Sequence, residues 1–195
     1  MAVKSKTDLK SVFNDVSSVF IQKADIPVTG GAITLNPEYD MPVTVDELSV
    51  SQDDPTINHY KVIGLDSDWT SSSTIGEMTI NMLVPTKHTD VLTFAWGSNA
   101  VETIGTVTLG TDLLSYDASI GGTWTGSGLK LKKHKVTCNM VLLDSAEKNM
   151  LIMRNVVLWA TPVYDTPSTN PFAVRFTGTI ESDGESDMIF ISKAD

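Results

Sequence analysis

The amino-acid sequence predicts a mainly β protein, a β-sandwich or open barrel with one short side helix and long loops. Segments in which apolar and polar residues alternate recur at short intervals, and a period of two is typical of half-buried strands. Clusters of Gly, Pro, Asp and Ser separate these segments, as in sandwiches and barrels. No linker or fixed-period repeat divides the 195 residues, so we expect one domain, with 1–24 as an N-terminal arm or helix.

The N-terminal region fits two structures. Apolar residues at 9, 12, 13, 16, 19 and 20 follow the spacing of a helix face, and Thr7 or Asp8 is a candidate N-cap. The same region also fits an arm that leads into a strand at 19–21. Both interpretations stay open at this point.

From Gly30 the pattern changes to a period of two. Short strands are expected at 32–35, 41–45 and 59–63. The polar, acidic stretch 46–58 between them is expected to be a long exposed loop or an extended hairpin tip.

The middle of the chain predicts one clear strand and the helix. Residues 76–84 alternate cleanly between apolar and polar side chains, and Pro85 ends that strand. Residues 86–96 carry a capping candidate and paired apolar residues, so a short helix closed by Gly97 is expected.

Weaker signals follow the helix. Strands are expected at 103–109 and 113–120. The segment 121–128 has four glycines in eight residues and is expected to be a mobile loop.

The last third of the chain carries the strongest strand pattern. Strands are expected at 136–142, 150–160, 172–180 and 188–191, with a turn at 144–149. The second of these is apolar on both faces and should therefore be a central strand of the sheet.

Composition narrows the class of protein. The chain is 41% hydrophobic and has a net charge of −10, so it has enough apolar residues for a core and should not grip a nucleic-acid backbone. A single cysteine, Cys138, allows no disulfide within the chain and favours a reducing compartment. With no signal-peptide pattern at the N-terminus and no membrane-length apolar run, we expect a soluble protein made in a cytoplasm.

Candidate catalytic and metal motifs are incomplete. His134 and Cys138 are four residues apart, which on a strand separates their Cα atoms by about 13 Å, too far for one zinc ion. The glycine-rich stretch is followed by Leu129 where a phosphate-binding loop needs Lys, and no Gly-x-Ser-x-Gly nucleophile motif occurs. We therefore expect no enzyme activity and no cofactor.

An acidic cluster near the C-terminus invites a calcium interpretation. Glu181, Asp183, Glu185 and Asp187 surround Gly184. The EF-hand pattern fails because no Glu follows at its twelfth position. An acidic hairpin tip is the better interpretation, and no metal is predicted.

The basic cluster and the tryptophans are the remaining candidates. Lys130, Lys132, Lys133 and Lys135 fit a nucleic-acid patch, an edge strand that blocks unwanted pairing, or a contact with acidic loops of a neighbouring subunit. Among the tryptophans, Trp96 and Trp159 are expected in the core. Trp124 is expected to contact a partner.

The C-terminal half resembles phage tail tube proteins. Residues 135–143, 144–149 and 150–158 are similar to the paired strands of that family, with Arg154-Asn155-Val156 as the recurrent step. Residues 171–180, including Phe176-Thr177-Gly178, resemble the strand before its C-terminal hairpin. The strand 78–85 followed by the short helix resembles its strand–Pro–helix unit.

The resemblance implies a structural virion protein of long-tailed phages. In that family, rings of six β-sandwich subunits stack into a tail tube whose negatively charged lumen lets DNA slide without binding, so the expected partners are other copies and other tail proteins. We expect no membrane partner. The alternatives are another virion or surface module, such as a head decoration protein or an adhesin domain, and a carbohydrate-binding sandwich. The candidate inter-subunit residues are Asp46, Glu47, Asp53, Asp54, Trp124 and the four lysines.

Overall fold

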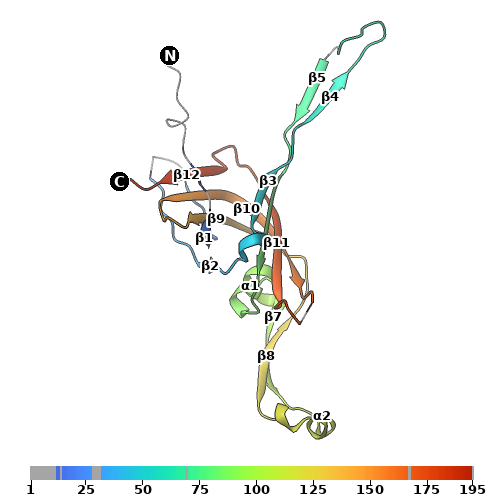
Figure 1. Cartoon of the computed structure of the whole chain (residues 1–195), viewed down its shortest axis with the longest axis vertical. Helices are drawn as coiled ribbons and strands as arrows, with labels where there is room; N and C mark the ends of the chain where they lie inside the picture. Colours follow the sequence, from blue (N-terminus) through green and yellow to red (C-terminus); the bar gives the residue numbers. More distant parts are fainter. Residues whose placement is uncertain (1–11, 14, 28–31, 69, 167, 195) are drawn as a thin grey trace.

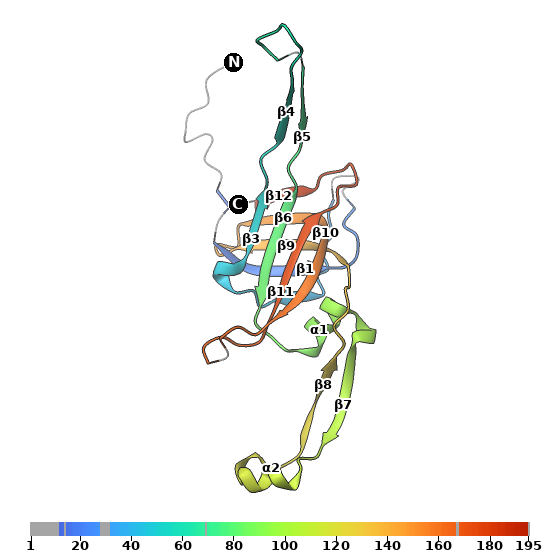
Figure 2. The same cartoon turned by 90° about the vertical axis from the view of Figure 1, so that its right-hand side faces the viewer.

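The computed structural model describes residues 12, 13, 15–27, 32–68, 70–166 and 168–194. It consists of a β-sheet body from which two long hairpins extend in opposite directions (Figure 1). The view turned by 90° shows the same arrangement, with one hairpin above the body and one below it (Figure 2). The prediction of a mainly β, sandwich-like fold is confirmed.

The body is one open antiparallel sheet in the order β2-β1-β9-β10-β11-β6-β3, with β12 also paired to β10. Its strands are β1 (Val16–Gln22), β2 (Tyr39–Met41), β3 (Ser49–Gln52), β6 (Met78–Val84), β9 (Val136–Asp144), β10 (Asn149–Val163), β11 (Ala173–Ile180) and β12 (Met188–Ser192).

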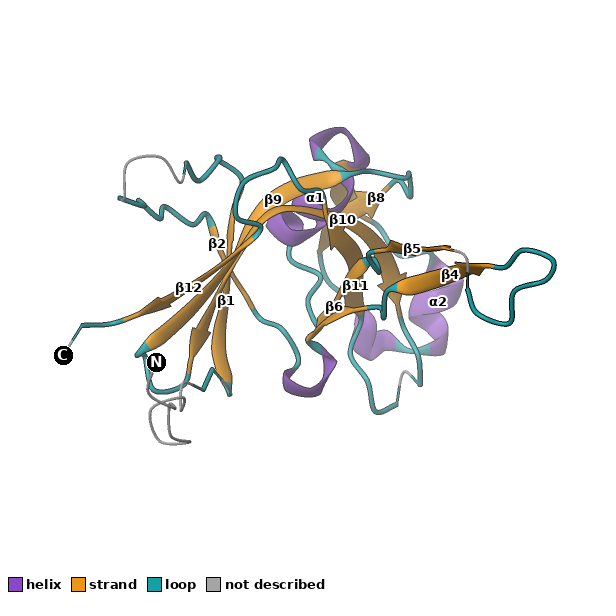
Figure 3. Ribbon diagram, turned by 90° about the horizontal axis from the view of Figure 1, so that it is seen from above, coloured by secondary structure: helices purple, strands orange, loops and turns teal. Residues whose placement is uncertain are grey.

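The long strand β10 divides the sheet into two layers. Its first part pairs with β12, its second part pairs with β11, and β9 pairs along the other edge. The register with β9 shifts between Met153 and Val156, where Asn155 has a left-handed φ of 51°. An extra residue on one strand bends that strand, and Asn tolerates the left-handed region better than most residues. The bend separates the β12 side of the sheet from the β11 side, as the view from above shows (Figure 3).

The main core lies between these layers and is closed by helix α1 (Thr89–Trp96). The ring centroid of Phe94 on α1 lies 5.7 Å from that of Phe176 on β11 and 5.4 Å from that of Tyr39 on β2. A second, smaller cluster forms on the other face of the sheet around Ile26, Val141 and Ile152. Because β10 contributes to both clusters, the prediction that it is apolar on both faces and central is confirmed.

Most predicted elements of the body are present. The expected strand at 76–84 is β6, and the last four expected strands are β9 to β12. The helix starts at Thr89, where His88 is the N-cap and its Nδ1 accepts from the Asp90 backbone N–H at 3.3 Å. Gly97, at a φ of 86°, ends it as expected.

The N-terminal third contains several errors of prediction. Residues 16–22 form β1, so the strand interpretation is right there, whereas Thr7 and Asp8 lie outside the described residues. The expected strand at 32–35 is wrong, because this segment has no strand partner and instead packs Ile33 and Leu35 on the smaller cluster.

Of the two structures expected for 46–58, the exposed loop is wrong, and the extended hairpin is closer because the segment leads into the β4–β5 hairpin. The segment contains most of the 3-10 turn η1 (Val45–Glu47), all of β3 and the start of β4 (Thr56–Tyr60). Strand β3 forms there because it pairs with β6. The strand expected at 59–63 is β4, which starts earlier, at Thr56, and pairs with β5 (Thr70–Thr74).

The glycine-rich region was predicted incorrectly as well. The expected loop at 121–128 contains most of β8 (Trp124–Leu129), which pairs with β7 (Val101–Val107), the strand expected at 103–109. A Cβ on Gly128 would lie 3.2 Å from Ile104 Cδ1, so this glycine makes room for a cross-strand side chain. The expected strand at 113–120 is instead helix α2 (Thr111–Tyr116) and the turn η3 (Ala118–Ile120), because β7 takes β8 as its partner and this segment connects them.

The buried carboxylate of Asp144 fixes the turn between β9 and β10. We expect its contribution to stability to be lost in acid. Asp144 accepts from the side chain of Asn149 at 2.7 Å and from the backbone N–H groups of Lys148 at 2.8 Å and Asn149 at 3.1 Å. These hydrogen bonds, the Asn149 side chain first, hold the pKa of Asp144 below its ordinary value. A lowered folded-state pKa stabilises the fold above the unfolded pKa of about 3.9, and this contribution is lost as the pH falls toward the folded value.

We therefore expect Asp144→Asn to be less stable than the wild type at pH 7, with a difference that shrinks as the pH falls through about 4. Urea unfolding midpoints at pH 7 and pH 3 measure this difference. The other carboxylates, including Asp183, titrate in both the wild type and the variant. Their effect therefore largely cancels from the difference in stability between the two proteins. An unchanged difference between the two pH values would contradict the assignment.

Candidate assembly interface

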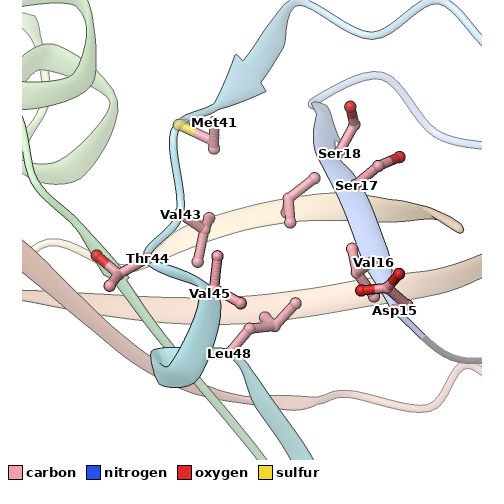
Figure 4. A pocket seen from close by; sticks show the side chains of 10 residues that line it. Asp15, Val16, Ser17, Ser18, Met41, Val43, Thr44, Val45 and Leu48 are labelled. Carbon is pink, nitrogen blue, oxygen red and sulfur yellow. The ribbon is translucent and has the colours of Figure 1, made fainter. Parts of the chain in front are cut away.

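Five surface hollows among the described residues measure about 280 to 330 Å³ each, at the lower end of the range for ligand pockets. One lies between β1 and the segment 41–48, where Val16, Val43 and Leu48 face it (Figure 4). Within the described ranges, no three His, Cys, Asp or Glu side chains gather to hold a metal ion. The candidate functional features are therefore the projecting hairpins and the surfaces at their roots.

The first projection, the β4–β5 arm (residues 53–75), exposes all its paired residues. The side chains of both strands are exposed along their whole lengths. Apolar residues are among them: Ile57 is 55% exposed, and Ile63 at the tip is fully exposed. A two-stranded ribbon with no apolar face packed on a core is marginally stable in water.

The second projection, the β7–β8 arm (residues 101–129), carries an aromatic tip. Trp124 is 49% exposed, and its indole N–H donates to the carbonyl of Ile120 at 2.9 Å, which fixes the ring beside η3. Tyr116 on α2 is 90% exposed. Trp124 is thus about half exposed on its own chain, and its contact with a partner stays a prediction.

The predicted lysines lie at the root of this second arm, between β8 and β9. Lys130 pairs with Glu102 of β7, and Lys135 pairs with Glu181 at 2.7 Å. Lys132 and Lys133 are exposed and form no ion pair with any residue that the structure describes. The segment runs beside the end of α1, since a Cβ on Gly97 would lie 3.4 Å from His134 Cε1.

An aromatic hollow adjoins the lysines. Lys133, His134, Trp159, Ala160 and Thr161 line it. Trp159 is 43% exposed, so its predicted place in the core is wrong. It lies on the β10 face opposite to its buried neighbour Leu158, where β10 and β11 present their outer surface. Trp96, in contrast, is buried in the core as expected.

The predicted acidic contacts are spread over the rim of the body and the root of the β4–β5 arm. Asp46 and Glu47 lie on η1, where they line a hollow together with Arg175 of β11. Asp53 begins the arm, and its backbone N–H donates to the carbonyl of Glu77 at 3.0 Å. Asp53 and Asp54 are exposed. Among the described residues, no ion pair joins one of these acids to one of the four lysines.

His134 and Cys138, which the sequence places too far apart for one zinc ion, lie in different surroundings. Cys138 is in the core and 1% exposed, and burial raises the pKa of its thiol to about 12. His134 is exposed on the surface. A raised pKa makes a thiol a poor nucleophile and metal ligand at neutral pH.

A buried arginine, which sequence reasoning did not single out as functional, organises the acidic C-terminal loop. The Arg154 side chain is 3% exposed, with Nη2 3.0 Å from Asp183 Oδ2 and Nη1 3.2 Å from Glu185 Oε2. Asp183 also accepts from the Asn155 side chain at 2.9 Å. The backbone N–H of Glu185, then Asn155 and Arg154, hold the pKa of Asp183 below its ordinary value. The one signal for this in the sequence is the single charged residue of a mostly apolar strand.

Arg154→Ala is expected to lower the free energy of unfolding by about 2 kcal/mol, because it removes charge-assisted hydrogen bonds and buried packing. Arg175→Ala on the exposed face of β11 is the matched control, and should cost about 0.5 kcal/mol or less. Urea unfolding measures both. Equal destabilisation by the two substitutions would show that Arg154 does not hold the loop.

The fold thus defines the chain as a mainly β, sandwich-like protein with two projecting hairpins. No protein-family model and no curated protein sequence matches it. Among solved structures, it is similar to a chain in the cryo-EM structure of the anti-feeding prophage baseplate, 6-fold symmetrised, with a TM-score of 0.35 and 9% sequence identity. The alignment covers 94% of this chain and 97% of that chain. A likeness at this level assigns neither a function nor an assembly.

The described helices are short. None of them combines the length and the apolar character that crossing a membrane would need.

Proposed function

We propose that this chain is a structural virion protein that self-assembles into stacked six-membered rings of a phage tail tube. The observation that carries the proposal is the pair of two-stranded arms that project from opposite ends of one packed body (Figures 1 and 2). In this role the chain works without a catalytic residue, a metal ion or a cofactor. It is made in the host cytoplasm and ends in the virion, in contact with further copies and other tail proteins.

The physical argument is that each arm needs a partner. Isolated two-stranded ribbons are marginal in water, and their open edges and exposed apolar residues invite association. Both ribbons form separate two-stranded sheets away from the body sheet. Other copies of the chain would supply the missing contacts, as in ordered polymers of a single subunit.

The placement of the arms favours an open stack over a closed small oligomer. A contact between two different surfaces of the same subunit repeats from copy to copy, and it forms a ring or an open polymer according to the rotation it generates. Arms at opposite ends allow each subunit to contact copies on both sides. Contacts on both sides distinguish a tube subunit from a decoration protein or an adhesin domain, which would act as a monomer or a closed oligomer.

The charge of the chain suits a conduit for DNA. With a net charge of −10, the subunit repels phosphates. Two of the four lysines at 130–135 already pair with glutamates of their own chain. We expect acidic side chains to outnumber basic ones on the bore, and free protein to bind duplex DNA weakly at physiological salt. A filter assay measures the binding of duplex DNA. Tight, salt-sensitive binding that is lost when the four lysines are replaced by Ala would contradict the expectation of weak DNA binding.

Self-association is the direct test. Sedimentation velocity over a wide concentration range, followed by negative-stain microscopy of the concentrated sample, should show rings and tubes. The control is a variant in which the arm residues 57–73 are replaced by a short Gly-Ser turn, which should remain folded and monomeric. A monomer at every concentration and salt, with no polymer on the grid, would overturn the proposal.

A further inference from the structure

The hollow lined by Lys133, His134, Trp159, Ala160 and Thr161, here the Trp159 hollow, has the composition of a binding hot spot. An exposed tryptophan combines large apolar area with a polar edge, and such residues dominate binding energy where they are covered by a partner. Lys133 gives the lining a positive charge, and the exposed Lys132 precedes it in the chain. Among the described residues, neither lysine forms an ion pair with a carboxylate. The hollow therefore suits a partner that is both apolar and acidic.

The tip of the β4–β5 arm has that chemistry. Ile63 and Leu65 are exposed at 106% and 45%, and Asp66 and Asp68 follow directly. Asp68 also contacts His59 of β4, with Oδ2 2.5 Å from Nδ1, so this contact joins the two sides of the hairpin next to the tip. Over residues 53–75 the sequence has four aspartates against one lysine, which makes this arm the charge complement of the hollow.

The tip of the β4–β5 arm and the Trp159 hollow lie on opposite sides of the body. The hollow adjoins α1, because His134 lines it and also contacts the position of Gly97. Helix α1 is at the end of the body from which the β7–β8 arm extends, whereas the β4–β5 arm leaves the other end (Figures 1 and 2). Two complementary surfaces on opposite sides of the body can meet only between copies, and the contact then repeats from one copy to the next.

We propose that the Trp159 hollow receives the tip of the β4–β5 arm from a second copy of this chain. The inference rests on the proposed self-assembly and names the contact that joins successive subunits. The tip of the other arm, at α2, is the rival occupant. It is less suited to a stack, because it projects from the same end of the body as the hollow. A contact between like ends joins two copies as a closed pair and does not extend the stack.

A disulfide between copies tests the contact in the full chain. Ile63→Cys combined with Thr161→Cys should give covalent dimers and a ladder of higher oligomers on non-reducing gels of the assembled protein. The native Cys138 contributes little background, because it is 1% exposed with a thiol pKa of about 12. The matched control pairs Tyr116→Cys on α2 with Thr161→Cys and should stay monomeric. A ladder from this control and none from the first pair would overturn the proposal in favour of the rival.

Charge reversal tests the same contact through a different readout. Lys132→Glu with Lys133→Glu should weaken self-association at least tenfold at low salt, and so should Asp66→Lys with Asp68→Lys. All four substitutions in one chain should restore it, since the charges are then exchanged. Lys148→Glu with Lys193→Glu makes the same change in net charge at exposed positions elsewhere on the body and should have little effect.

The outcomes separate this inference from the proposed function. If the wild type forms rings and tubes while the reversals leave assembly unchanged and the first cysteine pair gives no ladder, the contact is wrong and self-assembly stands. If the wild type stays monomeric throughout, both are overturned. Circular dichroism of each variant identifies a loss of fold, and the cysteine pair, which keeps every charge, still decides the contact if a reversal variant fails to fold.

Discussion

Phe176→Ala is expected to lower the free energy of unfolding by about 4 kcal/mol, because it removes a fully buried aromatic side chain and leaves a cavity. Phe176 is 0% exposed on β11, and its ring packs against Phe94 of α1 at a centroid distance of 5.7 Å. Phe94 in turn packs against Tyr39 of β2. The substitution therefore removes the contact through which the helix closes the core between the two layers of the sheet.

Urea unfolding followed by fluorescence measures this loss, since Trp96 reports on the same core. Thr177→Ala is the matched control: Thr177 is the next residue on β11 and is exposed, so a change of about 0.5 kcal/mol is expected. If Phe176→Ala were no more costly than Thr177→Ala, the assignment of the core would be wrong.

Gly178→Val should be the second most disruptive change, at about 3 kcal/mol or more, because overpacking against backbone cannot be relieved by a rotamer change. A Cβ at Gly178 would lie 2.0 Å from the carbonyl oxygen of Val157 on β10 and 2.7 Å from Leu158 Cδ2. The two paired strands would have to separate locally. The same assay measures the loss, and a reduced yield of folded protein should accompany it.

Gly126→Val in β8 is the control for this prediction. A Cβ at Gly126 meets no atom within 4 Å, and Val favours strands over Gly. It should therefore be tolerated in a monomeric sample. Similar stability of the two valine variants would mean that β10 and β11 do not pair at this register.

Burial explains which elements the sequence could predict. Strands β6, β9, β10 and β11 pack in the core, and burial imposes the alternation or the continuous apolar run that sequence reasoning detects. The β8 segment and α2 have only exposed or half-buried residues, so nothing in their composition marks their structure. Glycines in β8 predicted a loop, although a strand with a cross-strand partner accommodates them.

The candidate site was predictable only in part. The lysines and Trp124 stood out as residue types without a role in the core, and both lie on surfaces that the chain leaves exposed. Trp159 was misjudged, because its apolar neighbours in β10 conceal that the outer face of that strand is uncovered. Pairing of Arg154 with the acidic loop is a tertiary contact, and the sequence marks it only by a charged residue within a mostly apolar strand. The contact of the lysines and Trp124 with other copies of the chain stays a prediction.

The central claim is that the two arms become ordered through contacts with other copies of the chain. Hydrogen–deuterium exchange of the dilute and the assembled protein tests it most directly, with β9 and β10 as an internal reference. We expect the backbone amides of 56–60, 70–74, 101–107 and 124–129 to exchange rapidly in the dilute protein and to become protected on assembly, while the reference strands are protected in both. Arms that exchange equally fast in both samples, or that are already fully protected in the monomer, would contradict the account.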